Sequence, residues 1–545
     1  MLVLFAACSA AAKSAAAKSA AAKSAEFRSI VWLLVDDLRP QTYSYGQGEM
    51  WTPNLDALAR ESVVFERAYC QLTVCSPSRN SFLTGRRPDS LRVWNFETHF
   101  RETTRNAMSL PEYLKRWGYE TFGSGKTFQP NKPPEYDGKR SWDHYLPLVK
   151  NQTWCSRKYR QKQLDVCPEP RIPERQFMDR AIADYSASKI EKAKRPFFVV
   201  AGFYRPHLHW VMPQKFYDLY DDVDLKALEF SKRKPRDMPD VAWTNEGCHT
   251  LTTQATGTHV IDMNVPLADD VTSELRRGYF ACVTWIDYLC GRVLEKTPDD
   301  AIVVVSSDHG FHLGEQASWT KHTLFELSAR VPLMVRAKGL LEPRVQHTQF
   351  VELVDVFRTV VHLAGLPPPP DTAVQGTPLF FDDRARKNFS YALTQYPRCP
   401  RGGSIRETNC KRVPGNKIPV MGYSLRVDGY RFTEWYRWTP ALAIEPTAPP
   451  VATELYAYHE DRLADFDALE VKNIAKDHPC AVPHFRAALH LAVLSCQHAR
   501  GGGGGGGKDD CDAALARIVG RASRIVETRQ SSASCAPNEQ TNLQH

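Results

Sequence analysis

A cysteine followed by a proline turn and an arginine is the first group of residues that could do chemistry. The segment Cys75-Ser76-Pro77-Ser78-Arg79 runs on through Leu83 to Gly85. Ser78 to Leu83 can begin a helix, which would place Cys75 near a helix N-terminus, where a thiol's pKa falls and anions are attracted. Taken alone, so short a motif favours the simpler interpretation of a disulfide half or a buried thiol.

Two apolar runs, far apart in the chain, end in acidic residues. Residues 29–35 lead into Asp36-Asp37, and residues 302–307 lead into Asp308-His309. Continuous apolar runs of this length are typical of strands buried on both faces of a parallel sheet, and such sheets bind ligands at the carboxyl ends of their strands. Adjacent buried carboxylates need a compensating cation. The two strand ends together therefore predict one oxygen-rich metal site, whereas a lone Asp-Asp pair is commonly an exposed, capping turn.

The cysteine motif also resembles the signature of a known family. The stretch C-S-P-S-R-N-S-F-L-T-G-R-R-P matches that of the sulfatase family of the alkaline-phosphatase-like superfamily without a gap, and further family motifs follow in order from about Ser29 to Ala475. Within the family, the chain resembles the iduronate-2-sulfatase-like group. The motifs that carry this closer likeness are V-D-D-L-R-P, G-K-T-F, Y-R-P-H, S-D-H-G and M-G-Y-S-L-R-V-D-G-Y-R.

The resemblance implies a reaction and a set of roles. In the family the cysteine is oxidised to formylglycine, whose hydrated aldehyde attacks sulfur and then releases sulfate, so Cys75 would be the precursor of the nucleophile. The implied cofactor is a divalent ion, Ca²⁺ rather than Mg²⁺, and three carboxylates suit such a hard cation better than zinc. The implied ligands are Asp36, Asp37, Asp308, His309 and the modified Cys75. The other implied catalytic residues are Arg79, which steadies the hydrated aldehyde, Lys126, which contacts sulfate or the nucleophile, and His207 and Lys321, the candidates for general acid and sulfate clamp.

Two further residues bear on the substrate and on turnover. Arg39 follows the aspartate pair and could bind a substrate carboxylate through two hydrogen bonds. Gln129 stands where the iduronate-2-sulfatase-like group usually has histidine, three residues after Lys126. Glutamine can hydrogen-bond the aldehyde hydrate but does not accept a proton at physiological pH, so turnover would slow if that histidine is the base.

The expected function is removal of sulfate from a sulfated glycan by a sulfuric ester hydrolase. The group resemblance implies a sulfated uronic acid of heparan or dermatan chains, although algal and other matrix polysaccharides fit as well. Two alternatives stay open, a phosphodiesterase or phosphonate hydrolase of the same superfamily and a catalytically silent glycan-binding protein. The formylglycine-generating enzyme is an expected partner during maturation, and nucleic acid is not.

The elements that must hold these residues define an α/β fold. A third apolar run, 196–203, ends in Tyr204-Arg205-Pro206-His207, and helices are expected over 52–59, 109–117, 275–294 and 351–365. From about residue 418 the pattern alternates and turns at Asp428-Gly429, which predicts a hairpin. The resemblance implies an alkaline-phosphatase-like three-layer sandwich with a mostly parallel central sheet, followed by a smaller C-terminal α+β subdomain with a short antiparallel sheet.

We expect four segments along the 545 residues. Residues 1–26 form a leader containing three A-A-A-K-S repeats, 27–413 the sulfatase catalytic domain, 414–480 the C-terminal subdomain, and 481–545 a low-complexity tail. In this tail a helix-like segment near 485–496 precedes a flexible glycine linker at 501–507, and the remainder to His545 is expected to be disordered. The first eight residues resemble an incomplete signal segment.

Composition adds limits on location and partners. The formal net charge of +8 favours polyanionic partners or simply a solvated surface. No stretch of about eighteen apolar residues is present, so no membrane span is expected. Fourteen cysteines suit an oxidising compartment, and we expect the secretory pathway, lysosomal or extracellular, over the cytosol. The pairs Cys155/Cys167 and Cys399/Cys410 resemble loop disulfides of the iduronate-2-sulfatase-like group, and Asn151 and Asn388 are glycosylation acceptors if the chain is secreted.

Overall fold

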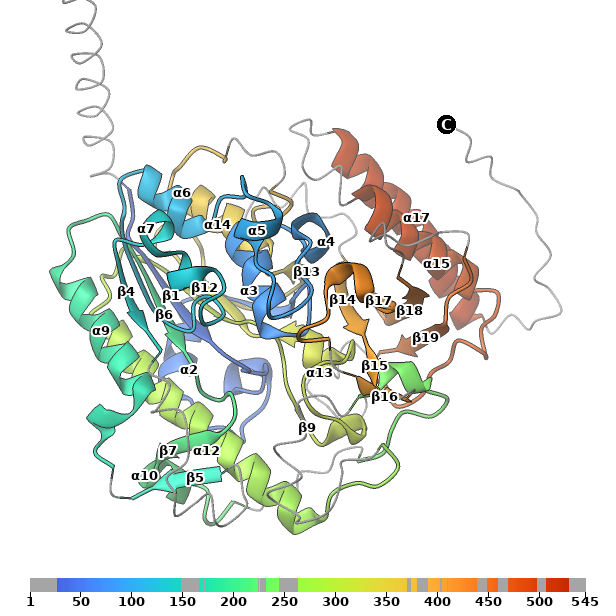
Figure 1. Ribbon diagram of the computed structural model, residues 1–545, viewed down its shortest axis with the longest axis horizontal. Helices are drawn as coiled ribbons and strands as arrows, with labels where there is room; N and C mark the ends of the chain where they lie inside the picture. The colour runs from blue at the N-terminus through green and yellow to red at the C-terminus, as the bar shows by residue number, and fades with distance from the viewer. Residues whose placement is uncertain are drawn as a thin grey trace, which may run out of the picture.

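A large twisted sheet runs through the molecule in the computed structural model (Figure 1). The structure describes residues 27–148, 166–170, 172–223, 225, 232–244, 263–369, 374–379, 391–401, 404–408, 410–438, 448–458, 469–496 and 506–528. Among these residues, nine strands form the sheet in the order β11-β2-β12-β8-β1-β6-β3-β4, with β13 paired to β2. The strands are β1 (Ile30–Val35), β2 (Val63–Tyr69), β3 (Glu120–Gly125), β4 (His144–Pro147), β6 (Phe197–Phe203), β8 (Ile302–Ser307), β11 (Arg330–Val331), β12 (Leu333–Arg336) and β13 (Arg344–Glu352).

The centre of this sheet is parallel, as the apolar runs predict. Strand β1 lies between β6 and β8 and runs parallel to both, and β3 runs parallel to β6 and β4. Antiparallel pairing appears towards one side, where β12 joins β8 to β2 and β11 also pairs with β2. The carboxyl ends of β1, β6 and β8 therefore meet at one edge of the sheet.

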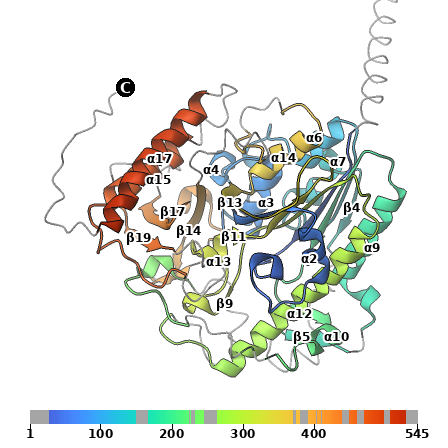
Figure 2. The same ribbon diagram turned by 180° about the vertical axis from the view of Figure 1, so that it is seen from behind.

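Helices cover both faces of the sheet (Figures 1 and 2). Alternate residues of β1 belong to two separate apolar cores, with Val31, Leu33 and Val35 in one and Ile30, Trp32 and Leu34 in the other. The first core includes α2 (Pro53–Ala59), α9 (Met178–Lys192) and α12 (Asp269–Leu294), and the second includes α3 (Cys75–Thr84), α6 (Leu110–Arg116) and α14 (Asp355–Leu363). This arrangement confirms the predicted three-layer α/β fold, because a strand apolar on both sides needs a helical layer on each.

The four expected helices correspond to α2, α6, α12 and α14, of which α12 begins earlier than expected, at Asp269. Shorter elements fill the connections. They are α4 (Pro88–Leu91), α5 (Phe100–Thr103), α7 (Gly138–Ser141), α10 (Gln214–Asp218), α13 (Glu326–Ala329), the pairs β5 (Val166–Glu169) with β7 (Trp210–Pro213) and β9 (His312–Leu313) with β10 (Trp319–Thr320), and the 3₁₀ turns η1 (Tyr43–Tyr45), η2 (Pro134–Asp137), η4 (Glu174–Gln176), η5 (Asp240–Ala242), η6 (Glu315–Ala317) and η7 (Gly415–Lys417).

A second, antiparallel sheet contains β14 (Ala392–Arg398), β17 (Val420–Val427), β18 (Tyr430–Arg437) and β19 (Ala452–Ala457), in that order. The predicted hairpin is present, since Val427 pairs with Tyr430 across Asp428-Gly429 and Gly429 takes the left-handed conformation. Strand β14 precedes residue 414, so the sheet draws on both sides of the expected boundary. Its Gln395 N–H donates to the carbonyl of Gln71, which ties this sheet to the end of β2.

The expected helix near 485–496 is present, and the structure differs from the expectation of disorder after the glycine linker. Helices α15 (Val482–Leu491) and α17 (Gly506–Glu527) pack against each other beside the antiparallel sheet, as both views show (Figures 1 and 2). The buried side chains of α17 recur at helical spacing, at Leu515, Val519 and Ala522. The preceding run of glycines concealed this amphipathic pattern. The expected domain limits otherwise remain a prediction.

Cross-links fix several loops of the C-terminal part. Cys399 and Cys410 form the predicted disulfide, with their Cα atoms 5.2 Å apart, in a segment formed partly by β15 (Pro400–Arg401) and β16 (Ser404–Thr408). Cys167, Cys480 and Cys511 are also disulfide-bonded. Cys155, Asn151 and Asn388 lie outside the described residues. Within the described chain, every helix is too short or too polar to cross a bilayer.

Candidate active site

The two acidic strand ends meet because β1 and β8 are neighbours in register, with Val35 opposite Ser307. The backbone N–H of Asp37 donates to Asp308 Oδ1 over 3.2 Å, and that of Leu38 donates to Ser307 Oγ over 2.9 Å. On the other side, the Asp36 N–H donates to the carbonyl of Phe203 at the end of β6. These contacts hold both acidic segments at the carboxyl edge of the sheet.

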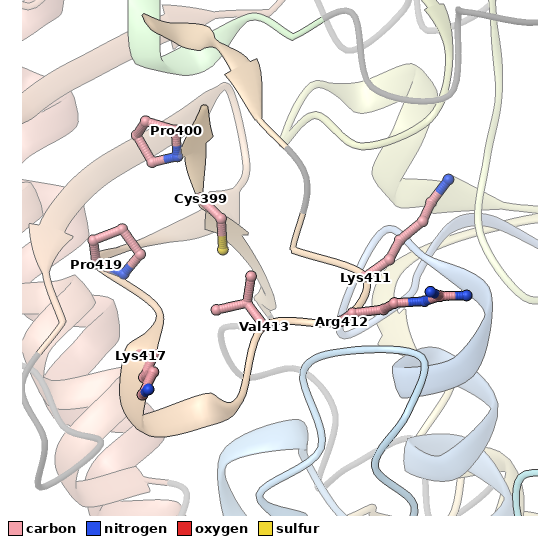
Figure 3. A pocket seen from close by; sticks show the side chains of 7 residues that line it. All are labelled: Cys399, Pro400, Lys411, Arg412, Val413, Lys417 and Pro419. Atoms are coloured by element: carbon pink, nitrogen blue, oxygen red, sulfur yellow. The ribbon is translucent and has the colours of Figure 1, made fainter. Parts of the chain in front are cut away.

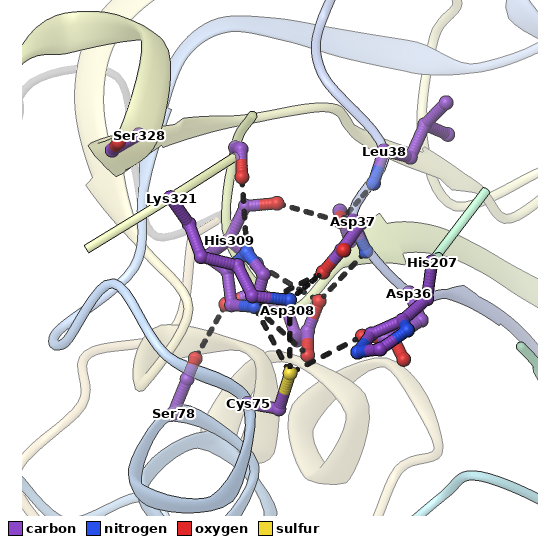
Figure 4. Close-up of polar contacts among 12 residues, drawn as sticks. Asp36, Asp37, Leu38, Cys75, Ser78, His207, Asp308, His309, Lys321 and Ser328 are labelled. Carbon is purple, nitrogen blue, oxygen red and sulfur yellow. Dashed lines mark hydrogen bonds and ion pairs between the residues drawn. The ribbon is translucent and has the colours of Figure 1, made fainter. Parts of the chain in front are cut away.

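Cys75 is the first residue of α3 and is only 1% exposed. Its Sγ atom lies 3.2 Å from His309 Nε2, 3.3 Å from Lys126 Nζ, and 3.5 Å from both Asp36 Oδ1 and Lys321 Nζ. Figure 4 shows the sulfur pointing into the group of acidic and basic side chains. The predicted convergence of these distant segments on Cys75 is thus present.

Three cationic side chains neutralise part of the acidic cluster. Arg79 Nε donates to Asp308 Oδ2 over 2.9 Å, and Arg79 Nη2 lies 3.2 Å from Asp36 Oδ1. Lys126 pairs with Asp36, and Lys321 pairs with Asp37. The carboxylates raise the pKa values of both lysines against the effect of burial, so both ammonium groups stay charged.

The thiol itself is not activated. Burial, followed by the negative charge of Asp36, raises the pKa of Cys75 to about 12, although Lys126 and Lys321 oppose this shift. The expectation of a lowered thiol pKa is therefore wrong for this site, because burial and the Asp36 carboxylate outweigh the two lysines. A thiol that stays protonated cannot serve as a thiolate nucleophile, which favours a precursor role for Cys75.

Both candidate histidines are neutral. Burial lowers the pKa of His309 to about 4 and that of His207 well below its usual value, with nearby Lys126 and Lys321 adding to the shift at His207. In each ring Nδ1 donates to a backbone carbonyl, that of Gly310 for His309 and that of Leu208 for His207. Each therefore directs an unprotonated Nε2 away from that bond. For His309, Nε2 lies 3.4 Å from Asp37 Oδ1 and 3.5 Å from Asp308 Oδ2.

The donor set fits a hard divalent cation. Ligand atoms of Asp36, Cys75, Asp308 and His309 lie within 4.8 Å of one another, as do those of Asp36, Asp37, Cys75 and His207. Burial, together with the charges of Asp36 and Asp308, raises the pKa of Asp37 to about 7 even though Lys321 lowers it. The protein's own cations thus leave this carboxyl undercompensated, and oxygen-rich, nitrogen-poor ligand sets are typical of calcium sites.

The structure gives less support to the two predicted substrate-binding residues, Arg39 and Gln129. Arg39 is fully buried, and its Nη2 lies 3.0 Å from Glu315 Oε1, which Arg276 also approaches. A guanidinium held in such a pair supports the loop after β1, so the geometry does not favour binding of a substrate carboxylate. Gln129 is half-buried, and among the described residues its Oε1 has no hydrogen-bond partner. A role for Gln129 remains a prediction.

Several supporting residues escaped the sequence analysis. Tyr279 on α12 donates its hydroxyl to the carbonyl of Asp37 and accepts from the Arg39 N–H, and no pattern in the helix distinguishes it from other tyrosines. Asp179 on α9 accepts the N–H groups of Tyr204 and Arg205, which shapes the turn that carries His207. Ser307 was detectable, because a small polar residue ends an otherwise apolar strand.

Comparison with known proteins places this geometry in a family. A sequence model of the family described as Sulfatase matches residues 28–366. The chain is 30% identical over 501 residues to iduronate 2-sulfatase of Mus musculus and 30% identical over 505 residues to that of Homo sapiens, in both cases across 80% of this chain and 90% of the relative. It is 25% identical over 448 residues to a sulfatase of Formosa agariphila, across 75% of this chain and 78% of the relative.

Solved structures agree on the fold. A phosphonate monoester hydrolase from Silicibacter pomeroyi superimposes with a TM-score of 0.64 at 19% identity, covering 86% of this chain and 96% of the other. A 2-O glycosaminoglycan sulfatase superimposes with a TM-score of 0.56 at 17% identity, covering 92% and 94%. The sequence matches and the shared fold lead to one conclusion: the chain belongs to the sulfatase family, a family of hydrolases with the alkaline-phosphatase-like α/β fold.

Proposed function

We propose that the protein removes sulfate from a sulfated glycan, using a nucleophile made from Cys75. The observation that carries this proposal is the position of Cys75 Sγ, within 3.5 Å of two ammonium groups, a carboxylate oxygen and an imidazole nitrogen. Two fixed cations beside a single nucleophile position suit an anionic ester, because they offset the repulsion between the ester and the attacking atom.

Formylglycine made from Cys75 would supply a hydrated aldehyde oxygen as nucleophile, and a divalent ion, Ca²⁺ rather than Mg²⁺, would supply positive charge for the sulfate oxygens. The residues that would hold the ion are Asp36, Asp37, Asp308 and His309, together with the modified residue 75. Arg79, anchored on Asp308 and Asp36 and donating to the carbonyl of Lys126, would orient the group at position 75.

Lys126 and Lys321 would bind the sulfate oxygens as charged ammonium groups. His207 would give its proton to the leaving oxygen. The His207 imidazole is neutral without substrate. The negative charge of a bound sulfate ester raises the pKa of a nearby imidazole, so substrate binding would itself protonate His207. We assign the acid role to His207 and sulfate binding to Lys321, because the pairing with Asp37 keeps the lysine charged throughout.

The substrate class we propose is a glycosaminoglycan that contains sulfated uronic acid. Support comes from the mouse and human relatives named iduronate 2-sulfatase, which the chain matches over four fifths of its length. We further propose maturation in the secretory pathway, with lysosomal or extracellular residence and a formylglycine-generating enzyme as partner. The disulfide-bonded Cys167, Cys399, Cys410, Cys480 and Cys511 support an oxidising compartment.

Sulfate release from 2-O-sulfated uronate disaccharides tests the proposal, using protein coexpressed with a formylglycine-generating enzyme. The mass of the peptide containing residue 75 reports conversion. Cys75→Ala should reduce the rate at least about 10³-fold, since it removes the nucleophile. Cys290→Ala, at another buried free thiol on α12, is the matched control and should retain activity. Converted protein that hydrolyses phosphate esters but not sulfate esters would overturn the assignment.

A further inference from the structure

A cavity of about 500 Å³ lies beside the Cys399–Cys410 disulfide (Figure 3). This volume falls within the range of roughly 300–1,000 Å³ that small-molecule sites occupy. Among the described residues seven line it, and of these Lys411, Arg412 and Lys417 are basic and none is acidic. The charge of the lining suits an anionic ligand. This basic pocket contains no residue of the Cys75 cluster.

The backbone that carries the basic residues is fixed on two sides. The disulfide holds Cys410 next to the end of β14. The Phe96 N–H donates to the carbonyl of Lys411 over 3.0 Å, and Asn95 Nδ2 donates to the carbonyl of Val413 over 2.8 Å. Lys411 and Arg412 extend to the same side of the loop, and Lys417 extends from its far end (Figure 3). A pair of neighbouring cations on an anchored loop is organised before a ligand arrives.

Neighbouring residues connect the basic pocket to the candidate active site. Arg398, which precedes the lining residue Cys399, donates to the carbonyl of His322 over 2.7 Å, and His322 follows Lys321, whose Nζ lies 3.5 Å from Cys75 Sγ. On the opposite side, the segment from Asn95 continues to Phe100. The Phe100 N–H donates to Asn80 Oδ1 on α3, the helix that begins with Cys75. The positive charges of Lys411 and Lys321 both contribute to lowering the pKa of His322, which agrees with this proximity.

Arg412 can exchange its present partner for a ligand. Arg412 is 88% exposed and lies 3.5 Å from Glu97 Oε1. An ion pair this exposed contributes little to stability, so a substrate anion can displace the carboxylate. Lys411 Nζ lies 5.9 Å from the centre of the Phe96 ring.

We propose that the basic pocket binds a second anionic group, a sulfate or a carboxylate, on the same glycan whose sulfate ester reacts at residue 75. The inference rests on the proposed function and narrows it, because such a subsite favours multiply charged oligosaccharides over small monosulfated esters. Lys411 and Arg412 are the residues that recognise the second anion. Their contribution falls on substrate binding and leaves the chemical step unchanged.

The test compares two double variants with the same change in charge. Lys411→Gln/Arg412→Gln alters the basic pocket. The control Lys192→Gln/Lys194→Gln alters exposed lysines that precede β6, at the opposite edge of the sheet. Binding is measured in the Cys75→Ala background, so that no probe is consumed. The probes are a heparin-derived tetrasaccharide and the same tetrasaccharide after chemical desulfation, each at low and physiological salt.

We expect the basic-pocket variant to bind the sulfated tetrasaccharide about fivefold more weakly than the control, the effect of losing two exposed ion pairs. An equal loss with the desulfated probe assigns the subsite to a carboxylate, and a loss confined to the sulfated probe assigns it to sulfate. In converted protein with Cys75 intact, KM for the tetrasaccharide should rise while kcat and the turnover of a small aryl sulfate stay unchanged.

Equal binding by the two double variants would overturn the subsite, as would equal changes in KM. Failure of the proposed function has a different signature. Converted protein would then release no sulfate from any ester, while the binding comparison between the two variants would still report on the basic pocket.

Discussion

Two buried clusters of charge differ in how completely the protein satisfies them. At the carboxyl edge of the large sheet, the Asp36, Asp37 and Asp308 carboxylates surround a protonated thiol, and the pKa of Asp37 reaches about 7. Beside the antiparallel sheet, Glu326 accepts from Tyr69 and from two arginines, and its pKa falls to about 2 because Arg426 and Arg431 outweigh its burial.

The second cluster is closed by hydrogen bonds from five separate segments. Glu470 Oε1 accepts from Arg431 and from the Tyr458 hydroxyl, and Oε2 accepts from the Glu326 N–H. Burial and the negative charge of Glu326 raise the pKa of Glu470 to about 7, as at Asp37. Both carboxylate oxygens of Glu470 nevertheless accept hydrogen bonds. A saturated network of this kind joins parts of the fold. In the proposed function, the cluster around Cys75 receives a cation and a substrate from outside.

The largest expected effect comes from breaking the saturated network. Arg431→Met leaves Glu326 and Glu470 buried without their shared cation, and we expect the free energy of unfolding to fall by roughly 3–5 kcal/mol. Activity per folded molecule should persist. Arg195→Met, at an exposed pair with Asp300, is the matched control and should change stability by less than about 1 kcal/mol. Denaturant unfolding measures both, and similar losses in the two variants would contradict the distinction.

The opposite result is expected at the active-site cluster. Asp37→Asn removes a carboxylate that Asp36 and Asp308 repel, and Lys321, which loses its partner, keeps the attraction of those two carboxylates. The metal-free protein should therefore keep its stability, while sulfate release falls by at least about 10²–10³-fold. Asp299→Asn, an exposed acid before β8, should leave the rate unchanged. A strongly destabilised Asp37→Asn protein would mean that both clusters serve the fold.

Calcium should distinguish the clusters directly. At about 100 times its dissociation constant, a bound ion raises the free energy of unfolding by about 2.7 kcal/mol. We expect this gain for wild type and Arg431→Met, its reversal by a chelator, and its absence in Asp37→Asn. Thermal unfolding with and without Ca²⁺ checks the prediction, and an unchanged gain in Asp37→Asn would place the ion elsewhere.

The smallest effect concerns a buried acid with only neutral hydrogen-bond donors. Glu454 accepts from Trp435 Nε1 and from the Tyr456 hydroxyl, and burial raises its pKa from 4.5 to about 7. The folded protein therefore keeps a proton that the unfolded chain loses above its own pKa, so stability falls as pH rises from about 4.5 through about 7. Glu454→Gln should remove this fall, giving a gain on the order of 2 kcal/mol at about pH 7.5 and none at about pH 4. Parallel pH profiles for the two proteins would refute the shift.

The cluster around Cys75 could largely be predicted from the sequence, whereas the network around Glu326 could not. The apolar run before Asp36-Asp37 and the run before Asp308-His309 identify strands and ligands, because burial on both faces leaves a clear local pattern. Arg39 shows where such reasoning fails. Its partner Glu315 lies 276 residues away, and nothing near Arg39 indicates that the side chain turns inward.

The contacts of the antiparallel sheet were harder to predict, because they too join residues that lie far apart in the sequence. The Asp428-Gly429 turn is a local signal and was found, whereas the network around Glu326 depends on five distant segments that meet only in the fold. Helix α17 was not predicted, because the glycine run at 501–507 weakens the helical signal ahead of Leu515, Val519 and Ala522. Tyr279 could not be selected, since its contact with Asp37 depends on how α12 crosses the sheet.

The burial of Cys75 has a consequence for the order of events in the cell. Helix α3 is buried along its whole length, and the sulfur at its first residue is enclosed by side chains from four other segments. A second protein cannot bring its catalytic groups to an atom in that position. If Cys75 is converted as proposed, the modifying enzyme must therefore reach the polypeptide before it folds, and a molecule that folds first would keep its thiol and lack the proposed nucleophile.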